Sequence, residues 1–309
     1  MFDKLRENRL LKYVHDKNLI DYFYLDYPVD KLVDKLTSLT FTIDEKKTNV
    51  PFNAQVKDYK GATDSDGNHW IIKKILPNEV LPHKLQELAY YIDFMLETLA
   101  APTVLDRIEN EYYRVTKVVQ NAVNISSYNY LQNPFRKVLS NDLINRWFFF
   151  DEDRNPNNYM VIHNSKNNPM IVAIDYNKAD IESEEMKITG NENKFGWYRK
   201  EKTRYLTLLD PANFEGFSIA NFDYRLKLLT NLPLDKIKEI AIKILTGFVD
   251  SPEKIAEKVI SNLDKRRKYI DEYFRRWFKE NEEERISEKE DQDYSGFGKS
   301  FLNYYKNKK

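Results

Sequence analysis

Eight consecutive residues, Asp151-Glu152-Asp153-Arg154-Asn155-Pro156-Asn157-Asn158, hold three carboxylates and three side-chain amides. Seventeen residues beyond Asn158, the apolar run 171–174 ends at another carboxylate, Asp175. Mg²⁺ prefers hard oxygen ligands, usually one or two carboxylates together with phosphate oxygens and water. Asn158 and Asp175 are therefore candidate magnesium ligands. Asp153, set back from the metal, is a candidate to accept or orient a hydroxyl proton during phosphoryl transfer.

The same segment has other interpretations. Phe148-Phe149-Phe150 followed by Asp151-x-Asp153 matches the apolar strand and Asp-x-Asp motif of haloacid-dehalogenase phosphatases. An EF-hand loop that starts at Asp151 is excluded, because Pro156 stands where glycine is needed and Ile162 where a bidentate glutamate is needed. The remaining interpretation is an Asp- and Asn-rich surface turn without chemistry.

A strand lysine that holds phosphates and a helical glutamate that orients it would favour transfer from a nucleotide. Trp70-Ile71-Ile72-Lys73 supplies the lysine, and we select Lys73 over its rival Lys74 although the inward phase of this strand is ambiguous. Glu87 lies near the start of the following helix. Both precede Asp153, as in kinases. A dehalogenase-type phosphatase instead opens its core domain with the Asp-x-Asp strand and then alternates helices and strands.

A strand-rich first part and a helix-rich second part must position these residues. Residues 1–40 are expected to be mostly helical, and Pro77 and Pro82 to lie in a connector. The expected strands are 41–43, 55–59, 70–76, 103–108 and 112–119, with a turn-rich loop over 61–68. A short hairpin is expected over 159–162 and 170–174, and the expected helices are 85–99, 236–248, 252–263 and 266–279.

Composition limits the classes of function. The 309 residues include 49 Lys plus Arg and 49 Asp plus Glu, so no net charge attracts nucleic acid or anionic lipid. The absence of cysteine excludes disulfides, thiolate metal sites and a cysteine nucleophile. The charged N-terminus lacks the apolar stretch of a secretory signal, and no long apolar run predicts a membrane span. We expect a cytoplasmic protein without a nucleic-acid partner, and export without a recognisable signal stays open.

The run Asp153-Arg154-Asn155-Pro156-Asn157-Asn158 followed by Ile174-Asp175 resembles the catalytic loop and metal-binding aspartate of HipA-like and phosphatidylinositol 3/4-kinase-like enzymes. Asn155 stands where that loop usually has histidine. The run Tyr113-Arg114-Val115-Thr116-Lys117-Val118 is similar to a kinase hinge strand, so the resemblance covers about residues 55–180. It implies an α+β, two-lobed protein-kinase-like fold, with a strand-rich N-lobe at 1–121 and a helical C-lobe at 122–309.

The resemblance also implies ATP and Mg²⁺ as cofactors, and it assigns roles by position. Asp153 would be the catalytic base, and Asn158 and Asp175 would bind Mg²⁺. Lys73 would contact the ATP phosphates and pair with Glu87. The remaining contacts would be main-chain groups at the adenine, from Lys117, Val118 and Val119, and a phosphate-covering loop with Gly61, Ala62 and Thr63.

Two features depart from this family. The expected phosphate-covering loop contains Asp64 and Asp66, which should repel a triphosphate, and it lacks the Gly-x-Gly-x-x-Gly pattern. The strand-end motif reads Asp175-Tyr176-Asn177 instead of Asp-Phe-Gly. The second departure bears on switching of this segment more than on metal binding.

The leading hypothesis is an ATP-dependent, HipA-like Ser/Thr protein kinase, with a protein that offers a Ser or Thr hydroxyl as its partner. Autophosphorylation is part of this hypothesis. A lipid or small molecule is the alternative acceptor for the same fold. The acidic loop favours a third hypothesis, a pseudokinase that serves as an interaction module. The fourth is a Mg²⁺-dependent phosphatase that uses Asp151.

Overall fold

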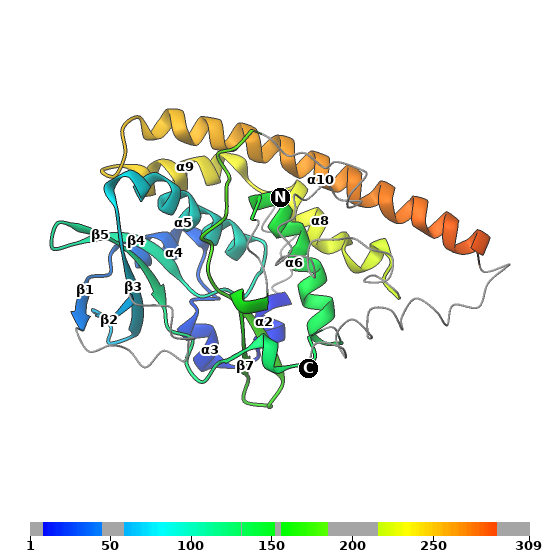
Figure 1. Cartoon of the computed structure of the whole chain (residues 1–309), viewed down its shortest axis with the longest axis horizontal. Helices are drawn as coiled ribbons and strands as arrows, with labels where there is room; N and C mark the ends of the chain where they lie inside the picture. Colours follow the sequence, from blue (N-terminus) through cyan, green and yellow to red (C-terminus); the bar gives the residue numbers. More distant parts are fainter. Residues whose placement is uncertain (1–8, 45–58, 131, 152–155, 185–215, 289–309) are drawn as a thin grey trace, which may run out of the picture.

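Two antiparallel sheets and a set of helices make up the described part of the computed structural model, which is residues 9–44, 59–130, 132–151, 156–184 and 216–288 (Figure 1). The strands of the first sheet come from residues 41–117, and those of the second from residues 123–173. Helices precede, interrupt and follow the sheets. This mixture agrees with the predicted combination of helix and sheet.

From residue 9, where the description begins, three short helices precede the first sheet: α2 (Arg9–Val14), α3 (Lys17–Tyr22) and α4 (Val29–Thr37). Asp16 caps α3 by accepting two main-chain hydrogen bonds from the first turn. Helix α4 buries Leu32, Val33 and Leu36 on one side, which is the spacing that predicted a helix. The prediction of mostly helical structure is thus confirmed for the described residues before β1.

The first sheet has the strand order β1 (Phe41–Asp44), β2 (Tyr59–Asp64), β3 (His69–Ile75), β5 (Glu111–Lys117) and β4 (Thr103–Ile108). Directly paired residues of antiparallel strands point to the same face. The register pairs Lys73 with Arg114 on one face, here called the front face, and Trp70 with Lys117 on the back face. The predicted strands at 41–43, 70–76, 103–108 and 112–119 are confirmed.

Helix α5 (Val80–Met95) connects β3 to β4 and packs against β4. It is buried almost all round, because α9 (Leu234–Leu245) covers its other side (Figure 1). The predicted helix at 85–99 is therefore displaced towards the N-terminus. Pro82, predicted to lie in a connector, is in the first turn of α5, where proline leaves no helical hydrogen bond unmade.

The second sheet consists of β6 (Val123–Asn124), β7 (Tyr159–His163) and β8 (Pro169–Ala173). The predicted hairpin is confirmed: in its turn the side chain of Asn164 accepts the N–H groups of Lys166 and Asn168. Ala173 also bonds to the main chain of the segment after α5, at Leu99 and Ala101, with 2.9 Å hydrogen bonds. The end of β8 is thereby fixed against the first half of the chain.

The second half contributes α6 (Phe135–Phe149), α8 (Asp223–Thr230), α9 and α10 (Pro252–Glu288). Figure 1 shows α10 as one long helix beside α9 and α8. The prediction of two helices, at 252–263 and 266–279, is wrong, because no Pro or Gly separates them and Asp264 pairs with Arg267 and Lys268 across the expected break. No described helix is apolar enough along its length to span a bilayer.

Candidate functional site

A cavity of 540 Å³, here called the cleft, lies between the first sheet and the β7–β8 hairpin. Strands β1, β2, β3 and β5 form one wall, and residues on either side of the hairpin form the other. Of the nine predicted nucleotide and metal contacts, eight line it: Gly61, Ala62, Thr63, Lys117, Val118, Val119, Asn158 and Asp175. The fold therefore gathers residues that are more than a hundred positions apart in the sequence.

The hairpin brings Asn158 and Asp175 to the same wall of the cleft. Asn158 directly precedes β7, and Asp175 comes two residues after β8 ends. Tyr159 pairs with Ala173, and the N–H of Ile174 donates a 2.9 Å hydrogen bond to the carbonyl of Asn158. The two predicted metal ligands are thus neighbours because of strand register.

Asp175 is held in an unusual backbone conformation. Its φ of 63° lies in the left-handed region, which residues other than Gly, Asn and Asp seldom adopt. Its carboxylate accepts hydrogen bonds from the main-chain N–H of Asn177 at 3.0 Å and from the Asn177 side chain at 2.8 Å. A conformation of this kind persists where the surroundings fix it, and such positions are common in functional sites.

Two cations stand on the front face beside the cleft. Arg114 is 7% exposed and lines the cleft, and its guanidinium donates to Asp175 at 3.2 Å and to the hydroxyl of Tyr59 at 2.9 Å. Lys73, its cross-strand partner, is half-buried with its ammonium 6.0 Å from the Tyr59 ring. Lys74 points to the back face and pairs with Glu111 at 3.0 Å. Of the two rival lysines, Lys73 is the one on the cleft side.

The predicted ion pair between Lys73 and Glu87 is wrong. Glu87 is 1% exposed and pairs with Lys84, 2.8 Å away, on the same helix. Both side chains also bond to the main chain of Leu105 on β4, at 2.9 Å from its N–H and 2.7 Å from its carbonyl. Burial raises the pKa of Glu87, against the charge of Lys84. The pair anchors α5 to β4, which leaves Glu87 turned away from Lys73.

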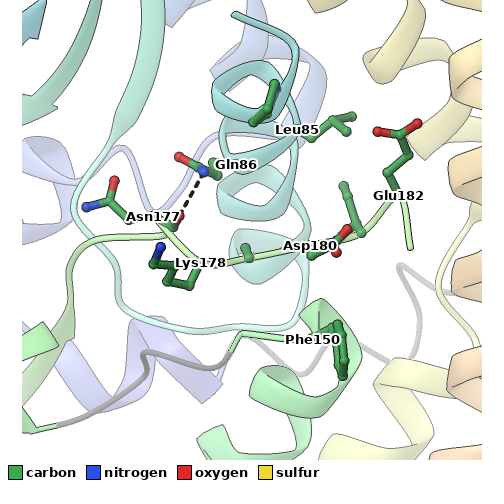
Figure 2. A pocket seen from close by; sticks show the side chains of 10 residues that line it. Leu85, Gln86, Phe150, Asn177, Lys178, Asp180 and Glu182 are labelled. Carbon is green, nitrogen blue, oxygen red and sulfur yellow. Dashed lines mark hydrogen bonds between the residues drawn. The ribbon is translucent and has the colours of Figure 1, made fainter. Parts of the chain in front are cut away.

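A different residue links α5 to the segment that follows β8. The side-chain amide of Gln86 donates a 3.1 Å hydrogen bond to the main-chain carbonyl of Asn177, as Figure 2 shows. Gln86 lies in the wall of a second cavity of 470 Å³, between α5, Phe150 and residues 177–182. Because Asn177 holds the carboxylate of Asp175, Gln86 connects the helix to Asp175 through one intermediate residue.

His83 lies one turn before Gln86, within reach of the charges of both front-face cations. Burial and the positive charge of Arg114 lower the pKa of His83 to about 4. The imidazole is therefore neutral at neutral pH and adds no third positive charge beside Lys73 and Arg114.

The end of β5 offers a small set of main-chain groups to a ligand. The N–H of Val118 donates to His69 at 3.0 Å, and its carbonyl accepts the hydroxyl of Tyr22, so both groups are occupied. The N–H of Lys117 donates to Pro102 at 2.9 Å, but proline has no N–H to give in return. In the described part of the chain, the Lys117 carbonyl and the main chain of Val119 are thus the predicted adenine contacts that no protein group fills.

The side chain of Lys117 points away from the cleft to the back face. Its ammonium donates to the Tyr22 carbonyl at 2.8 Å and to the Tyr24 hydroxyl at 3.1 Å. It also lies 4.1 Å and 4.4 Å from the centres of these two rings. Burial lowers the pKa of Lys117 to about 8, against the charge of Asp64. The N-terminal helices therefore contact the strand that ends at the predicted adenine contacts.

Gly61, Ala62 and Thr63 are in strand β2, so their predicted place in a phosphate-covering loop is wrong. Strand β2 continues to Asp64, whose carboxylate accepts the N–H groups of Asp66 and Asn68 and so closes a tight turn. Side-chain hydrogen bonds of this kind explain why the turn is shorter than its composition indicated. The segment between β1 and β2, with most of the predicted strand at 55–59, lies outside the described residues.

The two acidic residues of that turn do not face the cleft. Asp64 is on the back face, 5% exposed, and accepts a 2.8 Å hydrogen bond from the indole N–H of Trp70. Asp66 pairs with Lys35 of α4 at 2.5 Å. The expected repulsion of a triphosphate by these carboxylates therefore has no geometric basis. Asp44, at the end of β1, is a carboxylate that does line the cleft.

The predicted base Asp153 lies outside the described residues, and its role stays a prediction. The structure of the residues before Asp153 contradicts the phosphatase hypothesis. Helix α6 runs to Phe149 and ends at Phe150, which has a φ of 51°, so the apolar run is helical. A dehalogenase-type Asp-x-Asp motif needs a strand there, and the phosphatase hypothesis is wrong.

The donor set at the cleft fits Mg²⁺ better than a metal that needs an all-protein cage. No group of three or more His, Cys, Asp or Glu side chains able to hold an ion occurs among the described residues. Asp175, with a carboxylate, and Asn158, with an amide, line the same wall of the cleft, and Asp44 lines the opposite wall. Mg²⁺ commonly binds through one or two protein ligands and completes its shell with phosphate oxygens and water.

Sequence reasoning missed Arg114, Asn177, Gln86 and His83. The alternation along β5 places Tyr112, Arg114 and Thr116 on one face, but the sequence does not say that this face is the one occupied by Lys73. An Asn two residues after an Asp is a common turn pattern, and this was the available signal for Asn177.

Comparisons with known proteins bear on the fold. No protein-family description and no curated protein sequence matches the chain. Among solved structures, it is similar to the crystal structure of a Helicobacter pylori proinflammatory kinase, CtkA, with a TM-score of 0.51 and 14% sequence identity. The superposition covers 78% of this chain and 96% of that one. At this identity the similarity concerns the fold alone, which is a distant kinase-like fold.

Proposed function

We propose that the chain is an ATP-dependent phosphotransferase that works with Mg²⁺. The observation that carries the proposal is one cleft with Asn158 and Asp175 on one wall and the predicted nucleotide contacts of β2 and β5 on the other. One carboxylate and one amide oxygen, completed by phosphate oxygens, is the ligand set that Mg²⁺ uses in kinases. The kinase-like fold supports the same function.

The geometry supports a direction for the nucleotide. Its base would lie at the end of β5, near the Lys117 carbonyl and Val119, and its phosphates towards Lys73 and Asp175. Asn158 and Asp175 would hold Mg²⁺, which when bound neutralises charge on the phosphates. The role of Asp153 as the residue that accepts or orients the acceptor proton rests on its spacing from Asn158.

We further propose a HipA-like Ser/Thr protein kinase that can phosphorylate itself, with the lobe boundary between residues 121 and 122. The Asp153-to-Asn158 spacing followed by Asp175 supports the family. The end of the first sheet at Lys117 and the start of the second at Val123 support the boundary. A lipid or small molecule as acceptor is a separate outcome of the experiment below.

A second candidate is a nucleotide-binding module without turnover. It is favoured by the ion pair of Glu87 with Lys84, because a kinase normally uses the helical glutamate to hold the phosphate-binding lysine. Tight binding of Mg·ATP without formation of ADP or phosphorylated product would support this candidate over the first.

The test is incubation of the purified full chain with Mg·ATP, alone and with a generic protein substrate, followed by phosphopeptide mass spectrometry and an assay of ADP. We expect phosphorylated Ser or Thr, and loss of the signal in Asp153→Ala and Asp175→Asn. Asp250→Asn, an exposed carboxylate outside the cleft, is the matched control. Phosphorylation that survives in Asp175→Asn would contradict the proposed site. ADP formation that only a lipid or small-molecule acceptor stimulates would change the acceptor class.

A further inference from the structure

Two positive side chains lie side by side on the front face of the first sheet, beside the cleft. Lys73 and Arg114 are direct cross-strand partners on β3 and β5, so their Cβ atoms are about 5 Å apart. Like charges at this spacing destabilise a sheet unless an anion lies beside them. His83 on the adjacent helix is neutral, and Glu87 is engaged with Lys84. The described carboxylate that contacts Arg114 is Asp175.

The carboxylate of Asp175 cannot bind Arg114 and a metal ion equally well at the same time. Oδ1 accepts from Arg114 at 3.2 Å and from the N–H of Asn177 at 3.0 Å, while Oδ2 accepts from the Asn177 side chain at 2.8 Å. A divalent cation on this carboxylate would be repelled by a guanidinium that shares it. Metal binding at Asp175 is therefore favoured when Arg114 has another anion to contact.

We propose that Arg114 binds the carboxylate of Asp175 in the nucleotide-free protein and the phosphates of the nucleotide in the complex. This inference rests on the function proposed above. The planar guanidinium donates to carboxylates and phosphates with the same forked geometry. Arg114 is 7% exposed and lines the cleft, so it reaches the phosphates without leaving its strand. The exchange keeps Arg114 paired in both states and frees Asp175 when the phosphates arrive.

The exchange makes the nucleotide affinity depend on Arg114 and Asp175 together. The experiment measures the Kd of ATP without divalent metal, with EDTA present, and the Kd of adenosine, by calorimetry on the full chain. The proteins compared are the wild type, Arg114→Met, Asp175→Asn and the double variant, which form a double-mutant cycle. Lys74→Met is the matched control, because it removes one positive charge from the back face of the same sheet. The thermal midpoint of each variant reports its folding.

Arg114→Met is expected to weaken metal-free ATP binding by roughly tenfold or more, because hydrogen bonds between charged groups are lost. Adenosine binding should change by less than about twofold, since the base end of the cleft is untouched. Asp175→Asn is expected to strengthen metal-free ATP binding in the wild-type background, because it releases Arg114, and to do so much less in the Arg114→Met background.

Two results would count against the exchange. Equal gains from Asp175→Asn in both backgrounds would mean simple charge repulsion between Asp175 and the phosphates. Unchanged ATP binding in Arg114→Met would mean that Arg114 never contacts phosphate. If Arg114→Met fails to fold, Arg114→Gln, which keeps a donor for Tyr59, takes its place in the cycle. Wild-type protein that binds neither ATP nor adenosine would instead refute the proposed function, and with it this inference.

Discussion

The main-chain N–H of Ile174 donates a 2.9 Å hydrogen bond to the carbonyl of Asn158. This bond closes the open end of the β7–β8 hairpin, so the residues on either side of the hairpin are set by its register. The candidate metal ligands therefore depend on strand pairing, and their relative position should survive changes to their own side chains.

Asn158→Ala tests this independence. The hydrogen bond to Ile174 uses the main chain and is kept, so the free energy of unfolding should fall by no more than about 1–2 kcal/mol, from the loss of side-chain contacts. Mg²⁺-dependent phosphorylation should fall by about a hundredfold or more, because an amide ligand of the ion is lost. Urea unfolding and initial rates measure the two effects. Asn168→Ala, at the turn of the same hairpin, is the control and should leave both unchanged.

The ion pair of Lys84 and Glu87 should contribute to the stability of the folded protein. Glu87→Leu leaves a buried ammonium unpaired, so it should lower the free energy of unfolding by about 3–5 kcal/mol. The double variant Lys84→Met/Glu87→Leu removes both charges and should recover a large part of this loss, as denaturant unfolding would report. A Glu87→Leu protein of normal stability that cannot bind ATP would instead favour the catalytic role predicted from the sequence.

His83 should make the protein sensitive to mild acid. Its pKa is about 4 in the folded protein and 6.5 as the reference for the unfolded chain, so the unfolded state binds more protons between these values. Stability should therefore fall as the pH drops from 6.5 towards 4. We expect the Tm of His83→Gln to fall less than that of the wild type in this window. The same protection from His69→Gln, on the exposed end of β3, would contradict this assignment.

Lys117 should make the stability of the protein depend on pH in the alkaline range. Burial lowers its pKa from 10.5 to about 8, so between these values the unfolded state again binds more protons, and stability from this group rises with pH. The wild type should gain on the order of 3 kcal/mol relative to Lys117→Met between pH 7 and pH 10, measured by urea unfolding. Lys60→Met, on the exposed part of β2, should show no such gain.

Much of the fold could be predicted, because its elements are encoded locally. An extended run beside a turn-rich loop predicted β3, and turn chemistry predicted the β7–β8 hairpin with nearly the observed bounds. Errors arose where tertiary packing overrides local signals. Helix α5 extends through Pro82 because its first turn tolerates proline, and α10 is continuous because its charged residues pair along one helix.

The part of the candidate site that belongs to the Asp153-to-Asp175 motif could be predicted from the sequence. Asn158 and Asp175 follow from residue type and the hairpin, whereas Arg114 depends on which residue of β5 lies opposite Lys73. The predicted contact between Glu87 of α5 and Lys73 is wrong for a geometric reason. Successive helical residues point about 100° apart, so choosing Glu87 instead of Gln86 selects a different side of α5. Local pattern does not fix that rotation.

The bonds from Tyr22 to Val118 and from Lys117 back to Tyr22 carry a consequence for any shortened form of the chain. A polypeptide that starts near Thr40 would lack Tyr22 and so lose both bonds, and the end of β5 would be free to bend. Substitution of Tyr22 should therefore change the shape of the cleft at the end of β5, although Tyr22 itself does not line the cleft.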